Sequence, residues 1–119
     1  MSSERTHLHV YGIRQCDTCR AALKWLQARD VSHTFHDFRK DGLPEEQLRG
    51  WLASGHANKL MNKRSTTWRQ LDEAQKLAAE KDPLQVLLAN PTLIKRPVFT
   101  DGAAVLEIGF SPSSLEEHI

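Results

Sequence analysis

Residues Leu8–Leu26 have the sequence LHVYGIRQCDTCRAALKWL, and this stretch decides the fold. Its first four residues, Leu8–Tyr11, are mostly apolar and predict a strand that ends at a glycine-containing loop. The following residues place apolar side chains at i, i+3 and i+4 spacing, which predicts a helix over Asp17–Arg29. Both cysteines of the chain, Cys16 and Cys19, lie at this strand-to-helix turn.

A Cys-x-x-Cys motif in this position favours thiol chemistry. Unpaired N–H groups and the positive end of the helix dipole lie at the start of the predicted helix, and they stabilise a thiolate at Cys16. Cys19 follows one turn later, close enough to form a disulfide with Cys16. The sequence therefore predicts that Cys16 is a catalytic nucleophile in thiol–disulfide exchange, with Cys19 as the second redox-active residue.

Other interpretations of the two cysteines stay open at this point. Cys19 belongs to an apolar helical stripe that runs to Leu26, so it can also be a packing residue. Two cysteines are half of a zinc site, but no histidine pair follows at zinc-finger spacing, and alternation along a strand turns His33 and His36 to opposite faces. A structural disulfide is disfavoured in the cytoplasmic location that we expect.

Composition excludes several classes of protein. The chain has 119 residues, 39% of them hydrophobic and 26% charged, which predicts one globular domain over residues 1–119. Its 16 basic and 15 acidic residues give a net charge of +1, so we expect no direct DNA binding and no membrane partner. The sequence shows no signal-peptide pattern or long apolar run, and we expect a cytoplasmic monomer whose residues 1–6 are disordered.

The chain continues with a second strand and a block of helices. Thr34–Phe38 alternates apolar and polar residues, which predicts a strand and, with the preceding strand and helix, a parallel βαβ unit. The helices of the middle block are expected to begin at Pro44, at Thr66 or Thr67, and at Asp82–Pro83. The second of these helices is expected to carry Trp68, Leu71, Ala74, Leu77 and Ala78 on its buried side.

The last third of the chain returns to strands. Val98–Thr100 and Ala104–Ile108 flank the dipeptide Asp101–Gly102, which is typical of a tight hairpin turn with positive φ at both positions. Ser111–Pro112 then predicts the start of a short terminal helix with Leu115 facing inward. The predicted order is β-α-β, a helical block, and β-β-α.

This order, with Cys-x-x-Cys after the first strand, resembles the thioredoxin fold, and the helical block makes it similar to the arsenate-reductase-like family. The matching segments, within residues 7–119, are VYGI (10–13), CDTC (16–19), FHDFR (35–39), DGL (41–43), NKRSTTWR (62–69), IKRPV (94–98) and GFS (109–111). The YffB branch is the most similar, and the Spx branch of transcription regulators also carries Cys-x-x-Cys. The resemblance implies an α/β fold: a thioredoxin-like four-stranded mixed sheet, from residues 7–40 and 92–119, with an all-helical insertion over residues 43–90.

The resemblance also implies an anion-binding site. In thioredoxin-like folds the proline at the position of Pro97 is cis and faces the catalytic cysteine, which would place Arg96 beside Cys16. A guanidinium there would stabilise a thiolate and bind an oxyanion or carboxylate. Arg64, in a loop before a predicted helix, is the second candidate for anion binding. Without the resemblance, Arg96 is interpreted as a solvated surface residue and Arg64 as part of an ordinary capped helix start.

Two departures from the arsenate reductases narrow the expected substrate. Asn62 stands where those enzymes carry an arginine, and Glu107–Phe110 lacks their arginine after the last strand. The remaining arginines suit a singly charged carboxylate, such as that of glutathione, better than arsenate. We therefore expect a reductase with glutathione or another small thiol as co-substrate and no bound cofactor or metal. The alternative is an Spx-like redox-sensing regulator that binds the RNA polymerase alpha subunit.

Overall fold

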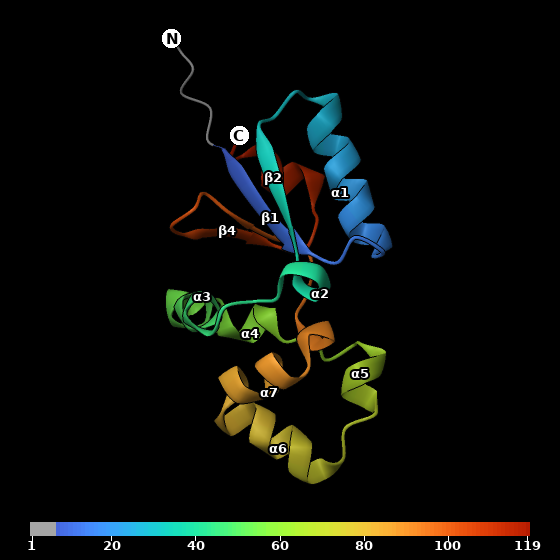
Figure 1. The fold of residues 1–119 in the computed structure, drawn as a ribbon, viewed down its shortest axis with the longest axis vertical. Helices are drawn as coiled ribbons and strands as arrows, with labels where there is room; N and C mark the ends of the chain where they lie inside the picture. The colour runs from blue at the N-terminus through green and yellow to red at the C-terminus, as the bar shows by residue number, and fades with distance from the viewer. Residues whose placement is uncertain (1–6) are drawn as a thin grey trace. The chain divides into compact units, whose positions relative to one another are not determined.

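The computed structural model describes residues 7–119, except the side chains of residues 56–58 (Figure 1). Residues 1–6, which the sequence predicts to be disordered, lie outside the described residues. Packing divides the described residues into two compact units, residues 7–41 with 96–119 and residues 42–95. The first unit contains the sheet and the second contains helices.

The first unit is built on a four-stranded mixed sheet with the strand order β2-β1-β3-β4. β1 (Leu8–Gly12) and β2 (His33–Asp37) are parallel, whereas β3 (Val98–Thr100) is antiparallel to both β1 and β4 (Val105–Ile108). The parallel pair follows from the helix that connects its strands, since a crossover returns the chain in the same direction. The four-stranded mixed sheet that the family resemblance implies is confirmed.

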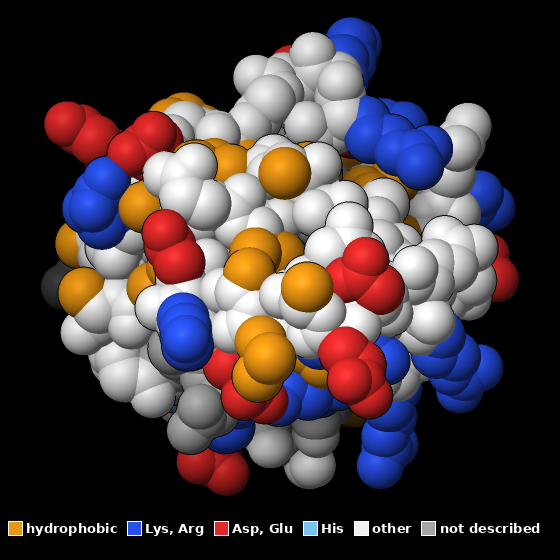
Figure 2. Space-filling view, turned by 90° about the horizontal axis from the view of Figure 1, so that it is seen from below, with side chains coloured by type: hydrophobic (Ala, Val, Ile, Leu, Met, Phe, Trp, Pro, Cys, Tyr) orange, Lys and Arg blue, Asp and Glu red, His pale blue; other side chains and the backbone are white. Residues whose placement is uncertain are grey.

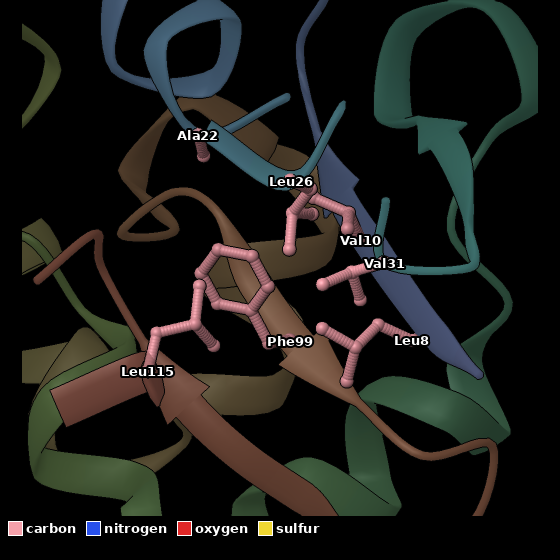
Figure 3. Packing of buried hydrophobic residues seen from close by; sticks show 7 residues of the cluster. All are labelled: Leu8, Val10, Ala22, Leu26, Val31, Phe99 and Leu115. Atoms are coloured by element: carbon pink, nitrogen blue, oxygen red, sulfur yellow. The ribbon is translucent and has the colours of Figure 1, made fainter. Parts of the chain in front are cut away.

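The core of this unit lies between the sheet and two helices, α1 (Asp17–Ala28) and α8 (Pro112–Glu116). Alternate residues of β1 point to the same face of the sheet, and helix periodicity brings one stripe of α1 toward them. Figure 3 shows these side chains pointing toward one another around a central phenylalanine. They are Leu8, Val10, Ala22, Leu26, Val31, Phe99 and Leu115, all buried. The predicted inward position of Leu115 is confirmed.

The end of β2 differs from the sequence prediction. Phe38 was expected in the strand but begins the short helix α2 (Phe38–Asp41). The cause is the carboxylate of Asp37, which accepts the backbone N–H groups of Arg39 at 2.8 Å and Lys40 at 3.2 Å. A side chain that accepts hydrogen bonds from the next turn favours a helix start over a continuing strand.

The connection between β3 and β4 is longer than predicted. Thr100 pairs with Val105, so four residues connect the strands, whereas the predicted strands leave three between them. The Asp101 carboxylate accepts the N–H groups of Ala103 and Ala104, at 2.9 and 2.7 Å, and this local bonding stabilises the wider turn. In the dipeptide Asp101–Gly102 only the glycine has a positive φ, of 96°.

The second unit consists of short helices. They are α3 (Glu45–Trp51), a π-helical segment (Leu52–His56), α4 (Ala57–Leu60), α5 (Thr66–Arg69), α6 (Glu73–Lys81), α7 (Pro83–Ala89) and a 3-10 turn (Pro91–Leu93). Pro44, expected as the first helical residue, directly precedes α3. Gly55 leaves helical geometry with a φ of 91°, a conformation that glycine adopts readily at the end of a helix. Leu84 and Leu87 of α7 are buried, and Leu88 is half-buried.

The prediction of one helix across Trp68–Ala78 is wrong. Ser65 caps α5 by accepting the N–H of Trp68 at 3.1 Å, and a second cap at Asp72 starts α6. Asp72 and Gln75 form a capping box in which each side chain accepts the other residue's N–H, so the chain starts a new helix there. Leu77, expected in the core, is 58% exposed as a result.

The surface mixes apolar and charged side chains. Figure 2 shows apolar side chains with both acidic and basic side chains around them. Charges of both signs on one face agree with the near-neutral net charge of +1. Among the helices described within residues 7–119, none is both long and apolar enough to cross a membrane.

Candidate active site

Cys16 is the residue immediately before α1, and its extended backbone, with φ −79° and ψ 125°, places it at the N-cap position. It is partly exposed and carries a free thiol. Its N–H donates to the carbonyl of Ile13 at 2.9 Å, which closes the turn between β1 and α1. The sulfur therefore lies at the end of the helix where N–H groups are unpaired.

The surroundings of Cys16 favour its thiolate. Burial disfavours the charged form, but the backbone N–H of Cys19, the side chain of Arg96, the Cys19 thiol and the N–H of Thr18 together outweigh it and lower the pKa of Cys16. These are the effects expected for a thiol at a helix N-terminus beside a guanidinium.

The surroundings of Cys19, in contrast, disfavour its thiolate. It is completely buried in the first turn of α1, on the same stripe as Ala22 and Leu26. The pKa of Cys19 is raised to about 12, and burial is the main cause. The backbone of Ile13 lowers this pKa, whereas the charge of the neighbouring Cys16 raises it. Cys19 is therefore a protonated thiol at neutral pH, and Cys16 is the better nucleophile of the two.

The Arg96–Pro97 peptide bond is cis, as predicted, and it lies directly before β3. Pro97 is buried, and its carbonyl accepts the N–H of Gly109 at 2.8 Å. Arg96 is partly buried and its side chain interacts with the sulfur of Cys16. The first unit thus brings Cys16, Cys19 and Arg96 together, and Pro97 follows Arg96 in the chain.

Arg64 belongs to the second unit, where its side chain is exposed. Its N–H donates to the side chain of Asn62 at 3.1 Å, and Ser65 caps the helix that follows. These bonds account for the local loop as a capped helix start. A role of Arg64 in anion binding stays a prediction.

Gly12 is a site residue, although from the sequence alone it is predicted only to be part of a loop. It ends β1, and a Cβ atom at this position would overlap the Sγ atom of Cys19. The absence of a side chain therefore lets the buried sulfur pack against the strand. An isolated glycine at the end of an apolar strand is the signal for such a close approach.

We expect Gly12→Ala to destabilise the protein by about 1–3 kcal/mol, because overpacking a rigid site forces the Cys19 sulfur or the strand to move. The free energy of unfolding, measured by urea denaturation of the reduced protein, tests this. The matched control is Gly50→Ala in α3, where a new Cβ meets no atom within 4 Å. That change should stabilise by about 0.5–1 kcal/mol through helix propensity.

Cys19→Ala should rescue the Gly12→Ala variant, since it removes the overlapping sulfur. A double-mutant cycle would show this as a favourable coupling energy between the two positions. Additive effects of the two substitutions would contradict the contact.

The mixed sheet, the Cys-x-x-Cys motif at the start of α1 and the cis proline before β3 define a thioredoxin-like thiol protein with a helical insertion. Among residues 7–119, no three or more His, Cys, Asp and Glu side chains are grouped to hold a metal ion. The chain belongs to the ArsC family, which matches residues 11–118.

Similar proteins place the chain within this family. An uncharacterized protein of Haemophilus influenzae is 49% identical over 104 residues, which cover 86% of this chain and 90% of that protein. The solved structure of a YFFB protein is 38% identical and superposes with a TM-score of 0.85, covering 93% of this chain and 97% of that chain. The global transcriptional regulator Spx of Staphylococcus aureus is 23% identical over 106 residues, 87% of this chain and 80% of the regulator.

Proposed function

We propose that the protein is a thiol-dependent reductase in which the thiolate of Cys16 attacks an oxidised thiol substrate, with glutathione as the co-substrate. The observation that carries this proposal is the division of roles between the two sulfurs. The pKa of Cys16 is lowered and that of Cys19 is raised, and Arg96 interacts with the Cys16 sulfur. A protein that only packed its two cysteines would have no need to stabilise a thiolate on one of them.

The first step is thiol–disulfide exchange on a mixed disulfide between a substrate thiol and glutathione. The Cys16 thiolate attacks the glutathione sulfur, the substrate–glutathione S–S bond breaks, and a Cys16–glutathione S–S bond forms. The electron pair of the broken bond leaves on the substrate sulfur, which takes a proton from water. Arg96, beside the reacting sulfur, binds the glutathione carboxylate and stabilises the thiolate before attack.

The second step returns Cys16 to its thiolate by one of two routes. A second glutathione, as thiolate, attacks the Cys16 adduct and leaves as oxidised glutathione. Alternatively, Cys19 loses its proton and attacks Cys16, which releases reduced glutathione and leaves a Cys16–Cys19 disulfide that two further glutathione molecules reduce. The raised pKa of Cys19, about 12, favours the glutathione route, since few Cys19 thiolates exist at neutral pH.

A regulator function is the second candidate. The relative named a global transcriptional regulator supports it, together with the Cys-x-x-Cys motif that a redox switch would need. In this role the protein would bind the RNA polymerase alpha subunit, and a Cys16–Cys19 disulfide would change that binding. The two candidates share the reactive Cys16 but differ in whether turnover occurs.

The test pairs a turnover assay with a binding assay on the wild-type protein. Turnover is followed as NADPH oxidation by glutathione reductase, with a glutathione mixed disulfide of a small thiol as substrate and arsenate as the comparison oxidant. Binding is measured to the C-terminal domain of the polymerase alpha subunit, with the protein reduced and oxidised. We expect turnover of the mixed disulfide above the arsenate rate. Redox-dependent binding without turnover would overturn the reductase in favour of the regulator.

A further inference from the structure

Several hydrogen bonds hold the loop between β1 and α1, residues 13–15. The carbonyl of Ile13 accepts the N–H of Cys16, and its backbone also interacts with the Cys19 sulfur. The carbonyls of Arg14 and Gln15 accept two hydrogen bonds from the Arg20 guanidinium, at 3.1 and 3.2 Å. This loop therefore fixes where the Cys16 sulfur lies relative to the start of α1.

Asp37 accepts a further backbone donor of the loop. The N–H of Arg14 donates to one carboxylate oxygen of Asp37 at 3.1 Å. The other oxygen accepts the N–H groups of Arg39 and Lys40 at the start of α2. Asp37 is only 9% exposed, and a buried carboxylate needs such donors to offset its desolvation.

The fold explains why Asp37 reaches this loop. β1 and β2 are parallel, and the last residue of one strand, Gly12, lies opposite the last residue of the other, Asp37. The segments that leave the two strands therefore start side by side. The guanidinium of Arg14 lies 5.2 Å from the ring centre of Phe35, a second contact between the loop and β2.

The surroundings of Asp37 favour its ionised form at neutral pH. Burial opposes its charge, but the N–H groups of Arg14, Arg39 and Lys40 more than compensate, with the Arg14 charge, and lower its pKa. The carboxylate therefore keeps both of its oxygens as acceptors at neutral pH. If this carboxylate were protonated or replaced by an amide, one of its two acceptor oxygens would become a donor. It would then lose its hydrogen bonds either to the loop, at the Arg14 N–H, or to the start of α2.

We propose that Asp37 is a positioning residue that holds the loop before Cys16, and through the loop holds the Cys16 sulfur against the donors that stabilise its thiolate. The inference rests on the proposed function of Cys16 as the reactive thiol. Asp37 acts through the Arg14 backbone and does not itself react.

The direction in which the Cys16 pKa changes when Asp37 is neutralised distinguishes this role from the alternatives. If Asp37 only contributed a negative charge near the thiol, its neutralisation would lower the pKa of Cys16. If it only stabilised α2, neutralisation would lower the thermal midpoint and leave the Cys16 pKa unchanged. If Asp37 is a positioning residue, its neutralisation raises the Cys16 pKa, because the displaced loop moves the sulfur away from the donors that stabilise its thiolate.

The experiment measures the rate of iodoacetamide alkylation at Cys16 against pH, by mass spectrometry of the folded protein. Asp37→Asn has nearly the same shape as Asp37 but replaces one acceptor by a donor, and we expect it to raise the Cys16 pKa by about one unit. Asp37→Ala removes both acceptors and should raise the pKa at least as far. Circular dichroism confirms that each variant is folded, and Asp37→Asn decides alone if Asp37→Ala does not fold.

The matched control is Asp101→Asn, which removes a carboxylate that accepts the N–H groups of Ala103 and Ala104 in the same unit. It should leave the Cys16 pKa at the wild-type value. An unchanged or lowered Cys16 pKa in the folded Asp37 variants overturns the inference. The alkylation measurement needs no substrate, so it is independent of the turnover assay. If the wild-type protein shows no turnover but the Asp37 variants raise the Cys16 pKa, the reductase proposal is overturned and the positioning role stands. If the wild-type protein turns over but the variants do not raise the Cys16 pKa, the positioning role is overturned and the reductase proposal stands.

Discussion

Cys16→Ser should reduce reductase turnover to the uncatalysed rate, a loss on the order of a thousandfold or more, because a hydroxyl at this position stays protonated and cannot attack a disulfide. The Cys16 thiolate is the group that the start of α1 and the Arg96 side chain stabilise. The measurement is the initial rate of the glutathione-coupled assay with a mixed disulfide as substrate. The thermal midpoint should change little, since Cys16 is partly exposed.

Cys19→Ser is the matched control for this substitution, because it makes the same atomic change in the other sulfur. With excess glutathione as the reductant, we expect this variant to keep turnover within about tenfold of wild type, as the glutathione route does not need Cys19. Its cost should instead appear in stability, because a hydroxyl would replace a sulfur in a fully buried position. The reverse order, with Cys19→Ser inactive and Cys16→Ser active, would contradict the assignment of the nucleophile.

Arg96→Ala should have the second largest effect. A hydrogen bond to a charged group contributes about 1.5–3 kcal/mol, so we expect turnover at low substrate to fall by about tenfold to a hundredfold. The loss should combine a raised Cys16 pKa with weaker binding of the anionic substrate, because the guanidinium interacts with the sulfur. Rates measured across pH separate the two, since a pKa effect is overcome at high pH and a binding effect is not.

Lys95→Ala is the control for Arg96→Ala, since Lys95 is the adjacent residue in the sequence and also a cation, but is exposed. We expect wild-type kinetics from this variant. Arg96→Lys should retain part of the activity, because lysine keeps the charge but not the planar set of donors. Equal losses from Lys95→Ala and Arg96→Ala would indicate a general effect of positive charge and contradict a specific contact at the sulfur.

The fold could be predicted where the sequence pattern is local. The strand and helix of residues 8–28 follow from apolar spacing, and the β3–β4 hairpin follows from a glycine between two apolar runs. The same reasoning failed across Trp68–Ala78, because the capping box at Asp72 outweighs a continuous apolar pattern. A capping-box pattern can be recognised in a sequence, but packing decides whether the cap or the apolar pattern that runs across it determines the helix.

The candidate site was predictable only in part, for a physical reason. The helix-start position of Cys16 is a local property of the chain, so the sequence identified it. The contact of Gly12 with the Cys19 sulfur depends on side-chain packing, and the contact of Asp37 with the Arg14 loop depends on which strands are neighbours. The proximity of Arg96 to Cys16 followed from family resemblance, because the two residues are far apart in the sequence.

The most direct test of the central claim is the pH dependence of alkylation at each cysteine of the reduced, folded wild-type protein. Iodoacetamide reacts with thiolates, so the midpoint of each rate profile gives the pKa of that thiol. The lowered pKa of Cys16 predicts a midpoint below 9.0, the ordinary value, with Cys16 modified first at neutral pH. The pKa of about 12 at Cys19 predicts negligible labelling there until the protein unfolds. Preferential labelling of Cys19, or a midpoint for Cys16 at or above that of an ordinary thiol, would contradict the account.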